Sequence, residues 1–179
     1  MVEKVSGAVG NLVFRRYEDE VVVGRKPDVS GVVETPAQAA HRERFRLAAV
    51  YGKGVFADPE TKAIYEKGAK ARGKPAFALA VADFLNEPVI DSIDLSAYTG
   101  QAGESIGISV HDDFEVVGVA VAIRSADGAI LEHGPAAKRP DGTWRYSTTT
   151  ALVAGQGVVI EVTASDRPGH KTVKTQAKP

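Results

Sequence analysis

The fold of the C-terminal half is decided by the stretch Val117-Gly118-Val119-Ala120-Val121-Ala122-Ile123. Large apolar residues alternate there with small ones, which is the period of a β-strand with one buried face. Trp144-Arg145-Tyr146-Ser147 and the run from Val158 to Ala164 repeat this alternation. Asp127-Gly128 lies between two apolar runs and is typical of a tight hairpin turn. About seven short strands at regular spacing predict an antiparallel β-sandwich.

The second face of the same strand carries small apolar residues. Its outward positions are Gly118, Ala120 and Ala122, whereas an exposed strand normally carries polar residues there. Two interpretations are open. Either a flat partner covers this face, namely the N-terminal segment or a neighbouring chain, or a central strand simply tolerates alanine.

The N-terminal segment predicts a β-hairpin. Two apolar runs, residues 11–16 and 21–25, flank a polar turn at Glu18-Asp19. Apolar side chains point to both faces of this ribbon, and a lone two-stranded hairpin is marginally stable in water. It therefore packs on its own helices, adds to its own sandwich, or lends strands to a neighbouring subunit by β-augmentation. The residues that we expect to make this contact are Leu12, Val13, Phe14, Val21, Val22 and Val23.

The segment between the hairpin and the sandwich has the start signals of helices. Thr35-Pro36-Ala37-Gln38 places a capping threonine, a proline at the first helical position and a glutamine three residues after the cap. We expect this helix to end at Gly52 or Gly54. Asp58-Pro59-Glu60 opens a second helix, and the apolar run 76–85 predicts a third.

Two stretches resemble bacterial proteins. Ala164-Ser165-Asp166-Arg167-Pro168-Gly169-His170 resembles the Ala-x-Asp-x-x-Gly-Asn/His turn of bacterial Ig-like domains, over roughly residues 89–178. This resemblance implies an Ig-like sandwich of the kind that serves as spacer, adhesion module or polymer-forming unit. Gly7-Ala8-Val9-Gly10-Asn11-Leu12-Val13 is similar to the opening of uncharacterised bacterial proteins and implies no functional residue. The expected α+β chain comprises a β-hairpin arm (1–34), a helical segment of two to three helices (35–87) and an Ig-like sandwich (88–179).

Composition argues against several classes of protein. The 179 residues include no cysteine, so disulfides and thiolate chemistry are excluded. Before Pro88 there are 14 basic and 12 acidic residues, and from Pro88 onward 8 and 11, so neither half has the basic excess of a nucleic-acid binder. No apolar run reaches the roughly 20 residues of a membrane helix. The start lacks a signal-peptide pattern, so we expect a cytoplasmic protein, or an extracellular one where the chain is a processed mature form.

Motifs for catalysis are missing from the sequence. There is no Gly-x-Ser-x-Gly and no phosphate-binding loop, and the four histidines have no zinc-ligand spacing. We therefore expect no enzymatic activity and no cofactor except calcium. Loops at one end of the sandwich could gather hard oxygens for this ion, and the residues concerned are Asp112, Asp113, Glu115 and Asp166. The alternative is that these aspartates cap their own backbone amides.

The leading hypothesis is a non-enzymatic structural protein that self-associates through its N-terminal hairpin into a filament or another ordered assembly. Its partner is then a second copy of the chain, with no nucleic acid and no membrane. One alternative is an Ig-like binding module for carbohydrate or peptide that uses its loops or Trp144 and Tyr146, although a single Trp in an alternating strand usually fills the core. A second alternative is an accessory component of a phage or secretion-type assembly.

Overall fold

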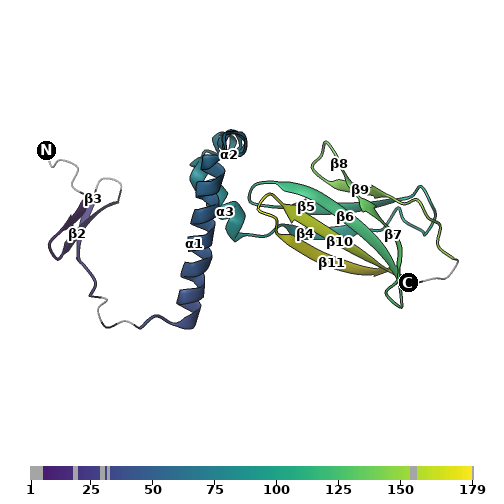
Figure 1. Cartoon of the computed structure of the whole chain (residues 1–179), viewed down its shortest axis with the longest axis horizontal. Coiled ribbons are helices and arrows are strands. Elements are labelled where there is room, and N and C mark those ends of the chain that lie inside the picture. Colours follow the sequence, from purple (N-terminus) through teal and green to yellow (C-terminus); the bar gives the residue numbers. More distant parts are fainter. Residues whose placement is uncertain (1–5, 18–19, 29–30, 32, 154–156, 179) are drawn as a thin grey trace. The chain divides into compact units, whose positions relative to one another are not determined.

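The structure is a computed structural model that describes residues 6–17, 20–28, 31, 33–153 and 157–178 (Figure 1). Within these residues the chain is α+β, as predicted, and its β-strands form three antiparallel sheets. The chain divides into two compact units, Met1–Ala40 and His41–Pro179. The elements are β1 (Gly7–Val9), β2 (Leu12–Tyr17), β3 (Glu20–Arg25), α1 (Pro36–Ala57), α2 (Pro59–Arg72), α3 (Ala76–Leu85), β4 (Val89–Asp94), β5 (Ser105–His111), β6 (Val116–Ser125), β7 (Ile130–Pro135), β8 (Ala137–Lys138), β9 (Trp144–Ser147), β10 (Val158–Asp166) and β11 (Lys171–Lys178).

The N-terminal unit contains a three-stranded sheet in the order β1-β2-β3, which we call the arm. The predicted hairpin corresponds to β2 and β3, with Phe14 opposite Val23. Its predicted turn, Glu18-Asp19, lies outside the described residues. The additional strand β1 pairs with β2 through a turn at Gly10, whose φ of 58° favours glycine. Three residues are too few to show a strand period, so this strand was not predicted.

The helices begin where the sequence predicts. The Thr35 N–H donates to Gln38 Oε1 at 2.9 Å and the Gln38 N–H donates to Thr35 Oγ1 at 3.2 Å, which is a complete capping box. The expected end of α1 at Gly52 or Gly54 is wrong, because the helix continues to Ala57. Gly52 is buried, and a Cβ there would lie 2.9 Å from Phe77 Cε2, so this glycine permits close packing of α3 instead of ending α1. In the described ranges, no helix is long and apolar enough to cross a membrane.

The C-terminal half is a sandwich of two four-stranded antiparallel sheets, β11-β10-β6-β7 and β4-β5-β9-β8 (Figure 1). Neighbouring inward residues come from strands far apart in sequence, as where Val121 pairs with Val162. Within the sandwich, the largest fully buried aliphatic side chains are Ile106, Ile108, Ile123, Ile160, Val121 and Val162. Burial of each contributes about 1.5–3 kcal/mol to folding, before cavity effects. The short strand β8 raises the number of sandwich strands described here to eight, against about seven expected.

Candidate functional site

The arm presents apolar side chains on both of its faces. Strand register places Leu12 and Val23 on one face and Val13 and Val22 on the other. Among the arm residues whose exposure the structure describes, which leave out Tyr17, none is buried: Leu12 is 44% exposed, Val22 48% and Val23 51%. Of the six predicted contact residues, Val13 and Phe14 are half-buried and the others are exposed. The arm is therefore a small sheet whose described residues form no core of their own.

Strand β3 is an edge of the arm. It pairs with β2 on one side, and no described strand pairs with its other side. Unpaired backbone groups along an edge can accept a further strand, and charged side chains on the edge restrict which strand does so. In β3 these charges are Glu20 and Arg25, at its two ends. The three central valines lie between them.

A shallow apolar groove of about 390 Å³ lies on the outer face of the β11-β10-β6-β7 sheet. The small outward residues Ala120 and Ala122 form part of its floor, and Thr163 opposes Ala120 across the β6–β10 pair. Ile130, His133 and Pro135 of β7 line one side. The two opposite charges next to it, Arg124 and Glu161, form an ion pair at 2.9 Å. This surface, which we call the small-residue face, exposes apolar groups with little net charge.

The outer face of the other sheet is polar. Asp94, Gly107 and Arg145 lie side by side across it, and Ser105 opposes Ser147. The side chains of Asp94, Arg145 and Ser147 are exposed. The two outer faces of the sandwich therefore differ in chemistry. If strands of this sandwich simply tolerated alanine on an exposed face, both outer faces should show it, so this interpretation does not fully explain the small-residue face.

The helical segment is attached to one end of the sandwich by aromatic contacts. Phe114, in the β5–β6 loop, stacks on Tyr65 of α2 with ring centroids 4.4 Å apart. The Arg72 guanidinium donates to the Phe114 carbonyl at 2.8 Å. Phe84 of α3 contacts the His170 ring edge-on at a centroid distance of 5.4 Å. These residues come from separate regions of the sequence, and sequence analysis did not identify the junction.

A buried polar network lies inside this junction. The Tyr51 and Tyr65 hydroxyls are 2.8 Å apart, and the Tyr65 hydroxyl donates to Asp83 Oδ2. Asp83 is fully buried on α3. Burial raises the pKa of Asp83 to about 7; the Tyr65 hydroxyl lowers it, and the nearby Asp112 raises it further. The only signal in the sequence is a single acidic residue within an otherwise apolar helix.

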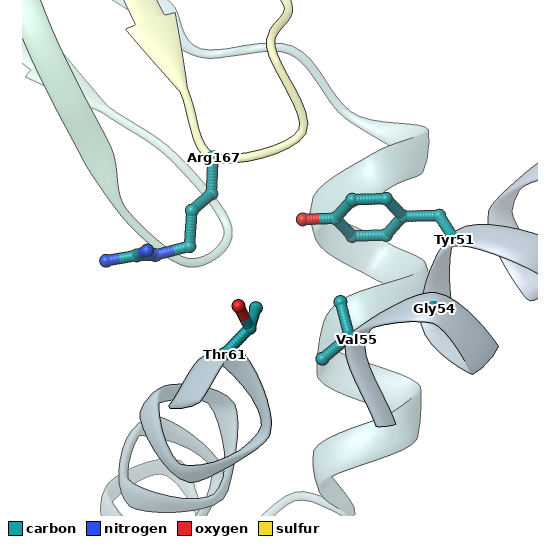
Figure 2. A pocket seen from close by; sticks show the side chains of 5 residues that line it. All are labelled: Tyr51, Gly54, Val55, Thr61 and Arg167. Carbon is teal, nitrogen blue, oxygen red and sulfur yellow. The ribbon is translucent and has the colours of Figure 1, made fainter. Parts of the chain in front are cut away.

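An open pocket of about 420 Å³ lies beside this network (Figure 2). Tyr51, Thr61 and Arg167 approach it from α1, α2 and the β10–β11 turn. Each polar group is already engaged: Arg167 donates to Glu115 at 2.7 Å, and Thr61 donates to Asp58. The polar groups that line the pocket are therefore already hydrogen-bonded within the protein.

The four predicted calcium ligands each have a protein partner. Asp166 Oδ1 accepts the N–H groups of Gly169 and His170, at 2.8 and 2.6 Å, and its Oδ2 lies 2.7 Å from His170 Nδ1. Asp112 accepts the Glu115 N–H at 3.2 Å, Glu115 is paired with Arg167, and Asp113 accepts from Asn86. In the described part of the chain, no three His, Asp or Glu side chains are placed to hold a metal ion. The alternative, aspartates that cap backbone amides, is confirmed for Asp112 and Asp166.

Trp144 and Tyr146 lie in the sandwich core. They are 7% and 5% exposed, so they form no aromatic platform on the surface. The Tyr146 hydroxyl donates to Glu132 Oε1 at 2.7 Å, and Glu132 also accepts the N–H groups of Thr149 and Thr150. Burial raises the pKa of Glu132, but these hydrogen bonds outweigh burial and lower the pKa overall. The expectation that Trp144 fills the core is confirmed.

Comparison with known proteins shows similarity to solved structures but to no sequence family. No protein-family model and no curated protein matches the chain. Among solved structures, CopC from Methylosinus trichosporium OB3b is similar with 15% sequence identity and a TM-score of 0.36, over 50% of this chain and 89% of CopC. At this level of similarity the match carries no argument about function.

Proposed function

We propose that this chain is a non-enzymatic structural protein that self-associates through its arm. The observation that carries the proposal is the exposure of Leu12, Val22 and Val23 on a sheet in which no residue of described exposure is buried. Burying the exposed half of one such side chain recovers about 1 kcal/mol. Several of them together are a source of affinity for a second copy of the chain.

The receiving surface that we propose is the small-residue face of a neighbouring copy. The β11–β4 side of the sandwich is a poorer acceptor, because Lys174 of β11 donates to the carbonyls of Ile90 and Asp91 on β4, at 3.1 and 2.6 Å. Such lysines protect sheet edges from further pairing. The small-residue face instead offers alanines, against which the larger side chains of the arm can pack closely. The central valines of β3 and the alanines of the small-residue face are uncharged, and Arg15 and Arg16 of β2 lie opposite Val22 and Val21 on the arm.

We further infer that the sandwich is of the Ig-like type. Its strand orders, β4-β5-β9-β8 and β11-β10-β6-β7, correspond to the A-B-E-D and G-F-C order of immunoglobulin domains with one strand added beside C. The Asp166 turn supports this inference, because its buried carboxylate holds two backbone amides of the β10–β11 connection. Ig-like sandwiches often serve as rigid units, which suits a structural role.

The first experiment tests the arm. The mass of the full-length chain is measured by light scattering over a range of concentrations, beside a variant that lacks Met1–Lys26. We expect the full chain to be larger than a monomer and the deletion variant to be monomeric. Val22→Arg should dissociate the assembly in the same way. Val33→Arg is the matched control, because Val33 is 89% exposed and lies outside the strands, and it should leave the mass unchanged. A full chain that is monomeric at every concentration would end the proposal.

The second experiment tests the receiving surface. Ala120→Glu places a charge on the small-residue face and should dissociate the assembly. Ser147→Glu places the same charge on the polar outer face of the other sheet and should not. Equal masses for these two variants would remove the small-residue face from the proposal while leaving the arm in place. Dissociation by Ala120→Glu without dissociation by Val22→Arg would assign assembly to the sandwich instead of the arm.

A further inference from the structure

Two carboxyl groups meet where the helical segment joins the sandwich. Asp83 comes from α3 and is fully buried, and Asp112 comes from the loop between β5 and β6. The Oδ1 atom of each is shielded from solvent, and neither has a hydrogen-bond donor among the residues that the structure describes. A buried acceptor without a donor is destabilising and rare, so this pair of atoms needs an explanation.

We propose that Asp83 and Asp112 share one proton, and that loss of this proton loosens the helical segment from the sandwich. Besides burial, Asp112 acts on Asp83 both through its charge and as a hydrogen-bonding neighbour, and both effects raise the pKa of Asp83. A proton on either Oδ1 turns that atom into the donor and leaves the other Oδ1 as its acceptor, so one proton satisfies both. The second oxygen of each residue is already provided for, because Asp83 Oδ2 accepts from Tyr65 and Asp112 Oδ2 accepts from the Glu115 N–H.

The groups packed around Asp83 favour the shared proton. From the helices, the Tyr65 hydroxyl donates to Asp83 and the Tyr51 hydroxyl donates to or accepts from Tyr65. From β10, Asp166 adds a third carboxylate, whose charge raises the pKa of Asp83. Burial is the largest cause of that shift, which places the pKa at about 7. Ionising both members of the pair would put two negative charges close together, one of them on the fully buried Asp83.

The cationic side chains near this pair are committed elsewhere. Arg167 donates through Nε and Nη2 to Glu115 Oε2, at 3.1 and 2.7 Å. His170 faces Asp166 at 2.7 Å. Neither is hydrogen-bonded to Asp83 or to Oδ1 of Asp112. A shared proton would therefore satisfy both Oδ1 atoms without a cationic side chain from the protein.

The sign of the pH dependence follows from the raised pKa. Between the ordinary aspartate value of 3.8 and about 7, the folded protein holds a proton that the unfolded chain has lost. Stability therefore falls as pH rises through this window and is level above it. For one proton, the unfolding equilibrium constant increases about tenfold for each pH unit. Because the proposed proton is shared, this dependence is assigned to the pair of carboxyl groups and not to Asp83 alone.

The test compares wild type with Asp83→Asn. The amide mimics the protonated acid, because its NH₂ donates to Asp112 while its oxygen accepts from Tyr65. Unfolding of the full-length proteins is followed from pH 4 to pH 9 by denaturant titration at one fixed protein concentration. The ratio of the wild-type unfolding constant to that of the variant should rise about tenfold per pH unit up to about pH 7 and then stay constant. A ratio that is independent of pH would overturn the proposal.

Two controls separate the proton from other species. Histidines also change charge between pH 5 and 8, so the comparison is repeated in a His170→Asn background, where the dependence should persist. It is also repeated with EDTA and with added Ca²⁺; a dependence that vanishes when Ca²⁺ is added would place a cation between the carboxylates and overturn the shared proton. If Asp83→Asn does not fold, carbon-13 NMR of the wild-type carboxyl groups decides. One carboxyl of the pair should titrate near neutral pH, and titration of both below pH 5 would overturn the proposal.

Discussion

Replacement of Gly68 by alanine tests how firmly the helical segment is packed on the sandwich. A Cβ on Gly68 would lie 2.3 Å from Phe114 Cε2 and 3.1 Å from Phe114 Cζ. Carbon atoms in contact prefer about 3.5–4.0 Å, so the ring must move by more than about 1 Å. The ring is held by its stack on Tyr65 at 4.4 Å and by the Arg72 guanidinium at 5.3 Å. It therefore cannot move without losing contacts.

The expected magnitude is a balance of three effects. Crowding in a packed site costs about 1–3 kcal/mol, and a lost aromatic pair costs about 0.5–1.5 kcal/mol. Alanine in place of glycine within a helix returns about 1 kcal/mol. We expect Gly68→Ala to lower the free energy of unfolding by about 0.5–3.5 kcal/mol. Gly54→Ala is the matched control, because a Cβ there meets no atom within 4 Å, and it should raise the free energy of unfolding by about 0.5–1 kcal/mol.

The assay is urea denaturation followed by circular dichroism at 222 nm, which reports the helices. The two Gly→Ala variants should differ in sign, with Gly68→Ala unfolding at lower urea than wild type and Gly54→Ala at higher urea. If both variants are stabilised to the same extent, Phe114 is not held against α2 and the packing argument is wrong.

Two further outcomes concern the sandwich. Glu132→Gln should lower the free energy of unfolding by about 3 kcal/mol, because in a buried site the new NH₂ group faces another donor, the Thr150 N–H. The control is Glu161→Gln, which changes the partly exposed ion pair with Arg124. In the same urea assay this control should lower the free energy of unfolding by less than about 1 kcal/mol. Since the pKa of Glu132 is lowered in the folded protein, its contribution is present above the ordinary glutamate pKa and is lost as pH falls through the folded value. Trp144 fluorescence should be blue-shifted and resistant to acrylamide, and an emission maximum typical of exposed tryptophan would contradict its place in the core.

Local patterns were sufficient to predict most of the fold. Alternation around Val121 and Ile160 predicted inward and outward faces correctly, because a strand has a period of two and the core is dry on one side only. Thr35 and Asp58 predicted the starts of α1 and α2, because a cap acts within three residues of itself. Gly52 was misinterpreted, since glycine both ends helices and permits close packing, and only the position of Phe77 distinguishes the two.

The helix–sandwich junction could not be predicted in the same way. Phe114 meets Tyr65, and Asp83 meets Asp112, through contacts between segments that no local period links. Asp83 alone gave a hint, as one acidic residue in an apolar helix. Asp166 was expected between the last two strands and is the last residue of β10. Its sequence context does not distinguish a carboxylate that accepts two backbone amides from one that binds a cation, and in the structure its Oδ1 accepts the Gly169 and His170 N–H groups.

The attachment of the helices to the β5–β6 loop and the β10–β11 turn has a consequence for ligand recognition. On the Ig-like assignment that we propose, the corresponding connections of antibody variable domains belong to the antigen-combining site. Here Phe114 and His170 are used instead to hold Tyr65 and Phe84. The loops at that end of the sandwich therefore contact the helices and are not free to bind a ligand. A ligand-binding surface made of loops would have to form at the opposite end, among the turns around Gly100 and Gly128.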